Sequence, residues 1–291
     1  MKTYLDCIPC FIKQSLEAAR MATDDEKIHA EVLKAVMNHL KSISFTKSPP
    51  ELSKDVHEII RNITKSKDPY KKVKDASNKM AKNRYPYLKK MVEEADDPLL
   101  MAVKLAIVGN VIDFGTSNRY NIEDMVANSV KKSFDDGVYP KFEKSLCNTN
   151  TILYLADNCG EIFFDKLLIK ELLKQDKKVT YVVRANPIIN DATVEDAKFA
   201  GIDKLATVFD GDAGQKQSAP GIVLNFASKE FLDLFKYSDM IISKGQGNYE
   251  GLSDVDRDVF FMLVVKCPLV ARDIDDEVGK LILKVKKDKK H

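Results

Sequence analysis

The 291 residues of the chain are 44% hydrophobic and 31% charged, which excludes a disordered protein, and a net charge of +2 gives no reason to expect a nucleic-acid partner. No apolar run reaches the ~18 residues of a membrane span, and the N-terminus lacks the apolar core of a secretory signal. Because five scattered cysteines do not form a disulfide framework, we expect a cytoplasmic protein with reduced thiols and no membrane partner.

The first half of the chain shows the apolar periodicity of helices separated by turns. Asp24 and Asn121 are the expected caps of two of these helices. The predicted helices cover residues 10–21, 24–40, a segment opening at 48, 70–81, 87–95, 99–114 and 121–134. We therefore predict a helical domain over residues 1–148.

In the second half, residues 149–291, the pattern changes to strands that alternate with helices. The predicted strands are 152–155, 178–183, 205–209, 240–243 and 259–265, with 281–285 as a further edge strand. The predicted helices between them are 162–174, 191–200 and 228–236. Short connections between alternating elements predict an α/β fold, a Rossmann-like parallel sheet with helices on both faces.

The first candidate site residues, Asp157 and Asn158, follow the predicted strand at 152–155. They should lie at the carboxyl edge of the sheet, where open α/β folds bind ligands. Carboxylate and amide oxygens suit Mg²⁺ or Mn²⁺. The alternative is that both residues cap the next helix.

A second polar loop runs from Arg184 to Thr193 and follows the next strand, so it should reach the same edge. Asp191 can give the same ion a second carboxylate, and Arg184 is a candidate phosphate ligand. The alternative is again a helix cap, formed by Asn190 or Asp191.

The third candidate is the segment 243–250, which follows the strand at 240–243. Lys244 offers a compact positive charge to a phosphoryl oxygen. Gly245 and Gly247 let the backbone approach an anion, and Asn248 completes the predicted phosphate-binding loop. The alternative is a tight turn with a solvated lysine.

Two further motifs lie in the helical half. Asn110 and Asp113 are spaced to share one helical face within an apolar segment, and we favour a site between the two halves as their environment. Cys7 and Cys10 form a single CxxC motif without a second pair, so we interpret them as two small buried residues on a helix.

Several of these motifs, in this order, resemble the metal-dependent damage-control phosphatases, a family long catalogued as domain of unknown function 89. The matching segments of the second half are 157–161, 186–193, 218–221 and 244–250. In the first half, the segments 7–10 and 109–113 resemble the prokaryotic, CxxC-bearing branch of that family.

The resemblance implies a helical domain beside a Rossmann-like sheet that holds a divalent cation (Mn²⁺, Mg²⁺, Co²⁺ or Ni²⁺) at its edge. It implies hydrolysis of phosphate from a small phosphorylated metabolite, such as a sugar phosphate or a damaged phosphometabolite. The residues that match the family's metal ligands are Asp157, Asn158 and Asp191. Lys244 matches its phosphate-side lysine, and Glu161, Asn110 and Asp113 match positions that line the pocket.

The expected reaction is hydrolysis of a phosphomonoester, with Asp157, Lys244 and Glu161 as the candidate catalytic residues. The cation and Lys244 would stabilise charge at the phosphoryl oxygens. Asp157 is either a nucleophile that forms a phosphoaspartate or only a metal ligand while water attacks.

Two other functions remain open from the sequence. An S-adenosylmethionine-dependent carboxyl methyltransferase would also place acidic residues at strand ends, although it would want a glycine-rich loop after the first strand. A non-catalytic protein that binds a metal or a phosphometabolite would keep the same ligands without releasing phosphate. The substrate, the preferred metal and the oligomeric state are not determined by the sequence.

Overall fold

A sheet of six strands lies at the centre of the computed structural model, which describes residues 1–110, 126–128, 130, 137–212 and 218–285. The strands are β1 (Thr151–Leu155), β2 (Lys178–Val183), β3 (Thr207–Asp210), β4 (Met240–Lys244), β5 (Phe260–Val264) and β6 (Leu281–Val285). Their order in the sheet is β3-β2-β1-β4-β5-β6, and only the β5–β6 pair is antiparallel. The predicted α/β class and the predicted strands are therefore confirmed.

The order of the strands creates a switch point between β1 and β4. From β1 the chain winds outward through β2 to β3, and it then returns to pair β4 with the other side of β1. Connections from β1 and β4 consequently leave the sheet on opposite faces. Open α/β sheets bind ligands in the crevice that such a divergence leaves at the carboxyl edge.

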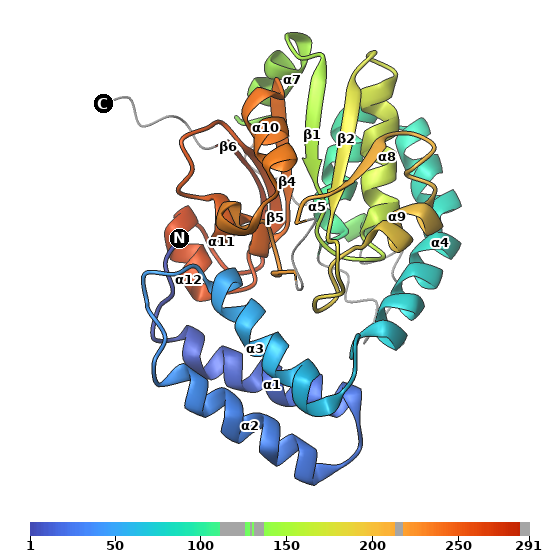
Figure 1. The fold of residues 1–291 in the computed structure, drawn as a ribbon. Helices are drawn as coiled ribbons and strands as arrows, with labels where there is room; N and C mark the ends of the chain where they lie inside the picture. The colour runs from blue at the N-terminus through green and yellow to red at the C-terminus, as the bar shows by residue number, and fades with distance from the viewer. Residues whose placement is uncertain (111–125, 129, 131–136, 213–217, 286–291) are drawn as a thin grey trace.

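Helices cover both faces of the sheet because its strands alternate side chains between two apolar cores. On one face, Ile152 and Tyr154 share a core with α4 (Lys71–Glu93), α5 (Pro98–Val108), α7 (Tyr139–Cys147), α8 (Ile162–Leu173) and α9 (Val194–Ala200). On the other face, Leu153 and Leu155 share a core with α10 (Lys229–Tyr237), α11 (Gln246–Leu252) and α12 (Pro268–Ile274). Figure 1 shows α8 and α10 on opposite sides of β1 and β4.

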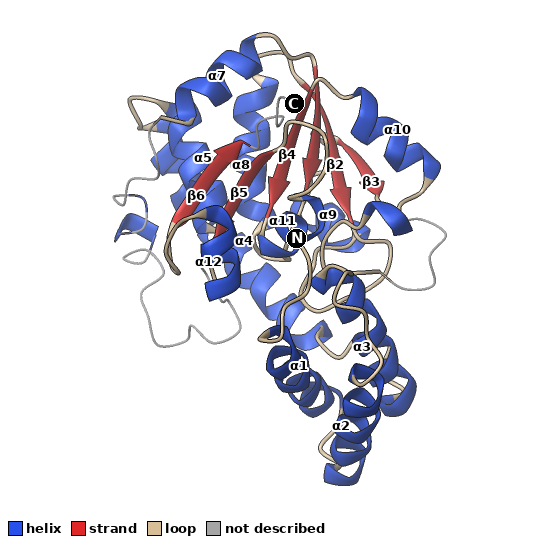
Figure 2. Cartoon of the chain, turned by 90° about the vertical axis from the view of Figure 1, so that its left-hand side faces the viewer, coloured by secondary structure: helices blue, strands red, loops and turns tan. Residues whose placement is uncertain are grey.

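Three N-terminal helices form a separate layer with its own core: α1 (Cys7–Ala22), α2 (Glu26–Leu40) and α3 (Pro49–Thr64). In Figure 2 the arrowheads of β2, β3 and β4 point toward this layer, so the helices stand opposite the carboxyl edge of the sheet. Arg61 of α3 donates to the Pro187 carbonyl in the loop after β2, at 3.1 Å. The division of the chain at residue 148 stays a prediction, and α4, α5 and α7 pack into the core of the sheet.

Several helix predictions were wrong in detail. The helices expected at 70–81 and 87–95 are one helix, α4, with Pro86 inside it. Leu88 and Val92 are buried in the sheet core, and this packing keeps the helix continuous across a residue that has no N–H. Asp25 rather than Asp24 caps α2, since its Oδ1 accepts a hydrogen bond from the Lys27 backbone at 2.8 Å.

The remaining differences concern short or undescribed segments. The helix expected at 99–114 is α5, which ends at Val108, and residues 111–114 and most of 121–134 lie outside the described residues. The seven-residue helix α11 lies in the segment predicted as a phosphate-binding loop, and the seven-residue helix α12 was not predicted. None of the helices in the described segments has both the length and the apolar character that crossing a membrane requires.

Candidate active site at the carboxyl edge of the sheet

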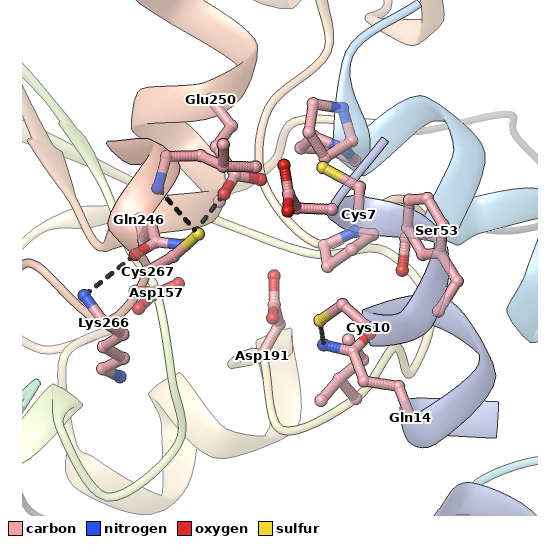
Figure 3. Close-up of a pocket in the computed structure, with 18 of the residues that line it drawn as sticks. Cys7, Cys10, Gln14, Ser53, Asp157, Asp191, Gln246, Glu250, Lys266 and Cys267 are labelled. Atoms are coloured by element: carbon pink, nitrogen blue, oxygen red, sulfur yellow. Dashed lines mark hydrogen bonds between the residues drawn. The ribbon is translucent and has the colours of Figure 1, made fainter. Parts of the chain in front are cut away.

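A cavity of about 750 Å³ lies between the N-terminal helices and the carboxyl edge of the sheet. Its walls come from α1 and α3 on one side and from the loops after β1, β2, β4 and β5 on the other. Figure 3 shows Asp157 and Asp191 among the lining residues, with Cys7, Cys10 and Ser53 on the side of the N-terminal helices. A volume of roughly 300–1,000 Å³ is typical of small-molecule sites.

Asp157 and Asn158 line this cavity and do not cap a helix. The next helix, α8, starts at Ile162 without a side-chain cap, so the capping alternative is excluded. The Asp157 Oδ2 accepts hydrogen bonds from the Asn110 side chain at 2.6 Å and from the Asn158 side chain at 2.7 Å. Its Oδ1 accepts none from the described residues, which leaves that oxygen available to a ligand.

Asp191 reaches the same cavity from the loop after β2, and it is not a cap either. Thr193 caps α9 in a reciprocal arrangement with Asp196. The Asp191 Oδ2 accepts from Arg184 Nε at 3.0 Å and from the Gly221 backbone at 3.2 Å. As with Asp157, the Oδ1 accepts no hydrogen bond from the described residues.

Backbone hydrogen bonds join the two acidic loops directly. The Ala192 N–H donates to the Asp157 carbonyl at 2.8 Å, and the Cys159 N–H donates to the Asn190 carbonyl at 2.9 Å. Asn158 and Asp191 form an isolated β-bridge. The expectation that these loops meet at one edge is therefore confirmed, while the roles of their side chains stay predictions.

The two carboxylates fit a divalent cation. Burial raises the pKa of Asp157 well above its usual range, and the neighbouring carboxylates of Glu161 and Asp191 raise it further. An added positive charge would relieve this repulsion. Because no three Asp, Glu, His or Cys side chains of the described residues are grouped for a metal, the remaining ligands would be the Asn158 amide oxygen and water, as Mg²⁺ and Mn²⁺ accept.

Lys244 lies elsewhere than the sequence suggested. Its side chain is fully buried, is absent from the cavity wall, and forms ion pairs with Glu161 and, at 2.9 Å, with Asp165. Burial lowers the pKa of Lys244, but Asp165 and Glu161 outweigh this effect and raise it overall. Its role as a phosphate ligand stays a prediction. In the structure Lys244 contacts Glu161 and Asp165 and does not reach the cavity.

The ion pair of Lys244 and Glu161 is connected to Asp157 through hydrogen bonds. Glu161 pairs with Lys244 through Oε1, and its Oε2 accepts from the Asn110 side chain at 3.0 Å and the Asn158 side chain at 3.2 Å. The same two amides donate to Asp157. Glu161 and Asn110 therefore orient Asp157, whereas Asp113 lies outside the described residues.

Asn248 and Arg184 form a second buried support, behind Asp191. Asn248 donates to the carbonyls of Ala156 at 2.9 Å and Lys244 at 2.7 Å, and it accepts from Arg184 at 2.8 Å and from the Ile222 backbone at 2.7 Å. These bonds use all four hydrogen-bonding positions of an asparagine side chain. Asn248 and Arg184 thus position the loops, and their predicted contacts with phosphate stay predictions.

The glycines after β4 allow the Asp157 side chain and the Pro220 backbone to approach closely. Gly245 has φ +80° and ψ 164°, and a Cβ on it would lie 2.0 Å from the Asp157 carboxylate. A Cβ on Gly247 would lie 2.6 Å from the Pro220 carbonyl oxygen. Gly247 lines the cavity, and the role of both glycines in binding phosphate stays a prediction.

Substitution of Gly245 by alanine (Gly245→Ala) is expected to displace Asp157. The conformation of Gly245 belongs to a region almost restricted to glycine, so strain should cost roughly 1–3 kcal/mol of unfolding free energy. Gly279→Ala is the matched control, because its φ is +89° but nothing lies within 4 Å of its added Cβ. Denaturant unfolding should show a lower free energy of unfolding in both variants. Phosphate release should be lower in Gly245→Ala alone. Equal activities of the two variants would contradict the close approach of Asp157.

Sequence reasoning missed residues on the far wall of the cavity. Cys7 and Cys10 are not two buried helical residues as interpreted, since Cys7 is only half-buried, Cys10 is exposed, and both line the cavity with Cys267. Lys266, which follows β5, is the exposed lysine of the lining. Burial raises the pKa of Asp157, whereas the positive charges of Lys266 and Lys244 lower it, and the effect of Lys266 is the larger of the two. The signal was present, because a lysine follows a predicted strand at the same edge.

Fold and site together define a Rossmann-like α/β protein with an acidic ligand cavity at the switch point of its sheet. Residues 3–282 match the damage-control phosphatase ARMT1-like domain family. A damage-control phosphatase of Archaeoglobus fulgidus is 34% identical over 96% of this chain and 97% of its own length. The damage-control phosphatase PH1575 of Pyrococcus horikoshii is 34% identical over 97% of both chains.

The solved structures agree with this assignment. The crystal structure of the DUF89 family protein from Pyrococcus horikoshii superimposes with a TM-score of 0.90 at 32% sequence identity, covering 99% of this chain and 100% of that one. The chain therefore belongs to the damage-control phosphatase ARMT1-like family, as the resemblance of its motifs indicated.

Proposed function

We propose that the protein is a metal-dependent phosphatase that hydrolyses phosphomonoesters of small metabolites, either sugar phosphates or damaged phosphometabolites. The observation that carries this proposal is the pair Asp157 and Asp191, which place two carboxylates on one cavity at the switch point, each with an uncommitted Oδ1. The names of the relatives favour a phosphatase over a methyltransferase.

Asp157, Asn158 and Asp191 would hold the cation, which when bound neutralises charge at phosphoryl oxygens and lowers the pKa of water. Glu161 and Asn110 keep the Asp157 carboxylate oriented toward the cavity. Lys266 supplies a positive charge on the cavity wall for the phosphoryl group.

The hydrogen bonds of Asp157 also favour water as the nucleophile. A carboxylate that ligates a cation through one oxygen must attack through the other. The Asp157 Oδ2 already accepts two hydrogen bonds from amide groups, which lowers the electron density available for attack. We therefore assign Asp157 as a ligand and water as the attacking group.

Phosphate release should depend on an added divalent cation. We expect purified protein to release inorganic phosphate from some members of a panel of phosphorylated metabolites with Mg²⁺, Mn²⁺, Co²⁺ or Ni²⁺. Treatment with a chelator should remove this activity, because Asp157 and Asp191 alone repel the phosphoryl group, and added cation should restore it. Full activity in chelator would contradict the metal requirement, and silence across the whole panel would favour a binding protein.

A further inference from the structure

Glu250 of α11 presents a carboxyl group to the cavity. Its half-buried side chain lines the same cavity as Asp157 and Asp191, and Figure 3 shows it beside Gln246. The Glu250 Oε1 accepts a hydrogen bond from the Gln246 side chain at 2.8 Å. Its Oε2 accepts none from the described residues, and it is not one of their inaccessible unpartnered atoms. This second oxygen is therefore open to a molecule in the cavity.

Glu250 stands near the proposed cation site without belonging to it. Among the described residues no three acidic, histidine or cysteine side chains are grouped for a metal, so Glu250 does not join Asp157 and Asp191 as a third ligand. The start of α11 is nevertheless close to Asp157, because a Cβ on Gly245 would lie 2.0 Å from that carboxylate. From Gln246 to Glu250 is about 6 Å along the helix. Such a position suits a group that acts on the alcohol side of a phosphomonoester.

The side chain of Gln246 holds the Glu250 carboxyl group in place relative to Lys266. Its amide nitrogen donates to Glu250, and its Oε1 accepts from the Lys266 backbone N–H at 3.0 Å. Gln246 and Glu250 are four residues apart on one face of α11, which is the spacing at which helical side chains meet. One amide therefore connects the acid to the residue that carries the proposed phosphate-binding charge.

Glu250 can carry a proton at neutral pH. Burial raises its pKa to about 7, although the hydrogen bond from Gln246 and the ammonium group of Met1 act in the opposite direction. A protonated carboxyl group does not repel a phosphoryl group, and an acid whose pKa lies near the working pH is well suited to general acid catalysis.

The other acidic groups on the cavity wall are less suited to this task. The two aspartates assigned to the cation are ligands, and Asp6 is exposed. Thiols are weak acids, and burial raises the pKa of Cys7 and Cys10 further. Glu250 is thus the carboxylic acid of the lining that is both sheltered from solvent and uncommitted at one oxygen.

We propose that Glu250 is the general acid of the reaction and protonates the alcohol oxygen that leaves phosphorus. This proposal rests on the proposed phosphatase function. As water attacks phosphorus, the P–O bond to the alcohol breaks, and its electron pair stays on the alcohol oxygen, which takes the proton of Glu250. The carboxylate then regains a proton from the attacking water, whose oxygen and second proton remain on the phosphate. One water is consumed, and the protein returns to its starting state.

The test compares a poor leaving group with a good one. Glu250→Gln keeps the shape of the side chain and can still accept the hydrogen bond from Gln246. It should lower kcat/KM for the best sugar phosphate by about 100-fold or more, as expected for loss of a general acid. It should leave kcat/KM for p-nitrophenyl phosphate almost unchanged, because p-nitrophenolate leaves without a proton. Retained turnover of that ester also shows that the variant is folded.

Glu171→Gln is the matched control. Glu171 is a buried glutamate that also bonds a neighbour in sequence, Lys174 at 2.8 Å, but it is absent from the cavity wall. The control should hydrolyse both esters at the rates of the unmodified protein. Cation affinity, measured by calorimetry without substrate, should be the same in both variants, because Glu250 is not grouped with the proposed ligands.

The outcomes separate the inference from the function on which it rests. Equal losses for both esters, or no loss for either, overturn the general acid while the phosphatase function stands. Weaker cation binding by Glu250→Gln also overturns it, since Glu250 would then be a ligand. If the unmodified protein hydrolyses neither ester with any of the four cations, the proposed function fails and the inference fails with it.

Discussion

Replacement of Asp157 by asparagine (Asp157→Asn) is expected to abolish phosphate release while the protein becomes no less stable. The new amide keeps the shape of the carboxylate and can still accept the hydrogen bonds from Asn110 and Asn158. It removes the negative charge that would bind the cation, and we expect kcat/KM to fall by roughly 10³-fold or more, comparable to removal of a catalytic electrostatic group.

Although activity should fall in Asp157→Asn, the stability of the metal-free protein should not. The pKa of Asp157 is raised in the folded protein, first by burial and then by Glu161 and Asp191. Above the usual aspartate pKa of about 3.9, the folded state therefore binds more protons than the unfolded state, so metal-free stability falls as pH rises through this window. In Asp157→Asn the side chain at this position does not titrate, so its contribution to the loss of stability with rising pH is removed.

The measurement is denaturant unfolding in chelator at a series of pH values rising from the usual aspartate pKa of about 3.9, together with phosphate release in added cation. Asp233→Asn is the matched control, because Asp233 is exposed on α10 and absent from the cavity wall. The control should change neither quantity. Retained activity in Asp157→Asn would remove Asp157 from the catalytic site, and a large loss of stability would show that its charge is compensated in the folded state.

The meeting of Asp157 and Asp191 was predictable because it follows from topology. Each residue comes shortly after a parallel strand, and the carboxyl ends of parallel strands share one edge. The sequence could not choose between ligands and caps, since an acidic residue before a helix suits both roles. That choice depends on where α8 and α9 begin: α8 begins at Ile162 as predicted, and α9 begins at Val194, three positions later than predicted.

The environment of Lys244 was not predictable, because it depends on the last residue of a strand. The predicted strand ends at residue 243, which leaves Lys244 in the following loop, whereas the alternation of side chains fixes the face on which a strand residue lies. Lys244 is the final residue of β4 and shares a face with Ile242. Its partner Asp165 is 79 positions away in the chain, on a helix with no sequence signal beyond a charged residue in an apolar run.

The helical wall of the cavity was also beyond the sequence. Cys7, Cys10 and Ser53 belong to amphipathic helices whose periodicity shows which side is apolar but not what the other elements of the fold place against them. Their position opposite the sheet edge depends on tertiary contacts such as that between Arg61 and the loop after β2. Pattern alone therefore assigned Cys7 and Cys10 to a buried surface.

Replacement of Lys244 by methionine (Lys244→Met) is expected to destabilise the fold by roughly 3–5 kcal/mol, because it leaves the buried carboxylates of Glu161 and Asp165 without their cation. Adding Glu161→Gln should restore part of the lost unfolding free energy, since it removes one of the uncompensated charges. Denaturant unfolding of the single and double variants measures both effects.

Lys266→Ala is the informative comparison, since Lys266 is exposed and lines the cavity. That variant should unfold like the unmodified protein and lose phosphate release, because it removes the positive charge that we propose for binding the phosphoryl group. The pair of variants thus separates a lysine that builds the site from a lysine that acts in it. A Lys244→Met protein of normal stability with a selectively raised KM would reverse the assignment. Such a result would mean that Lys244 of the unmodified protein leaves its carboxylate partners and contacts phosphate in the cavity.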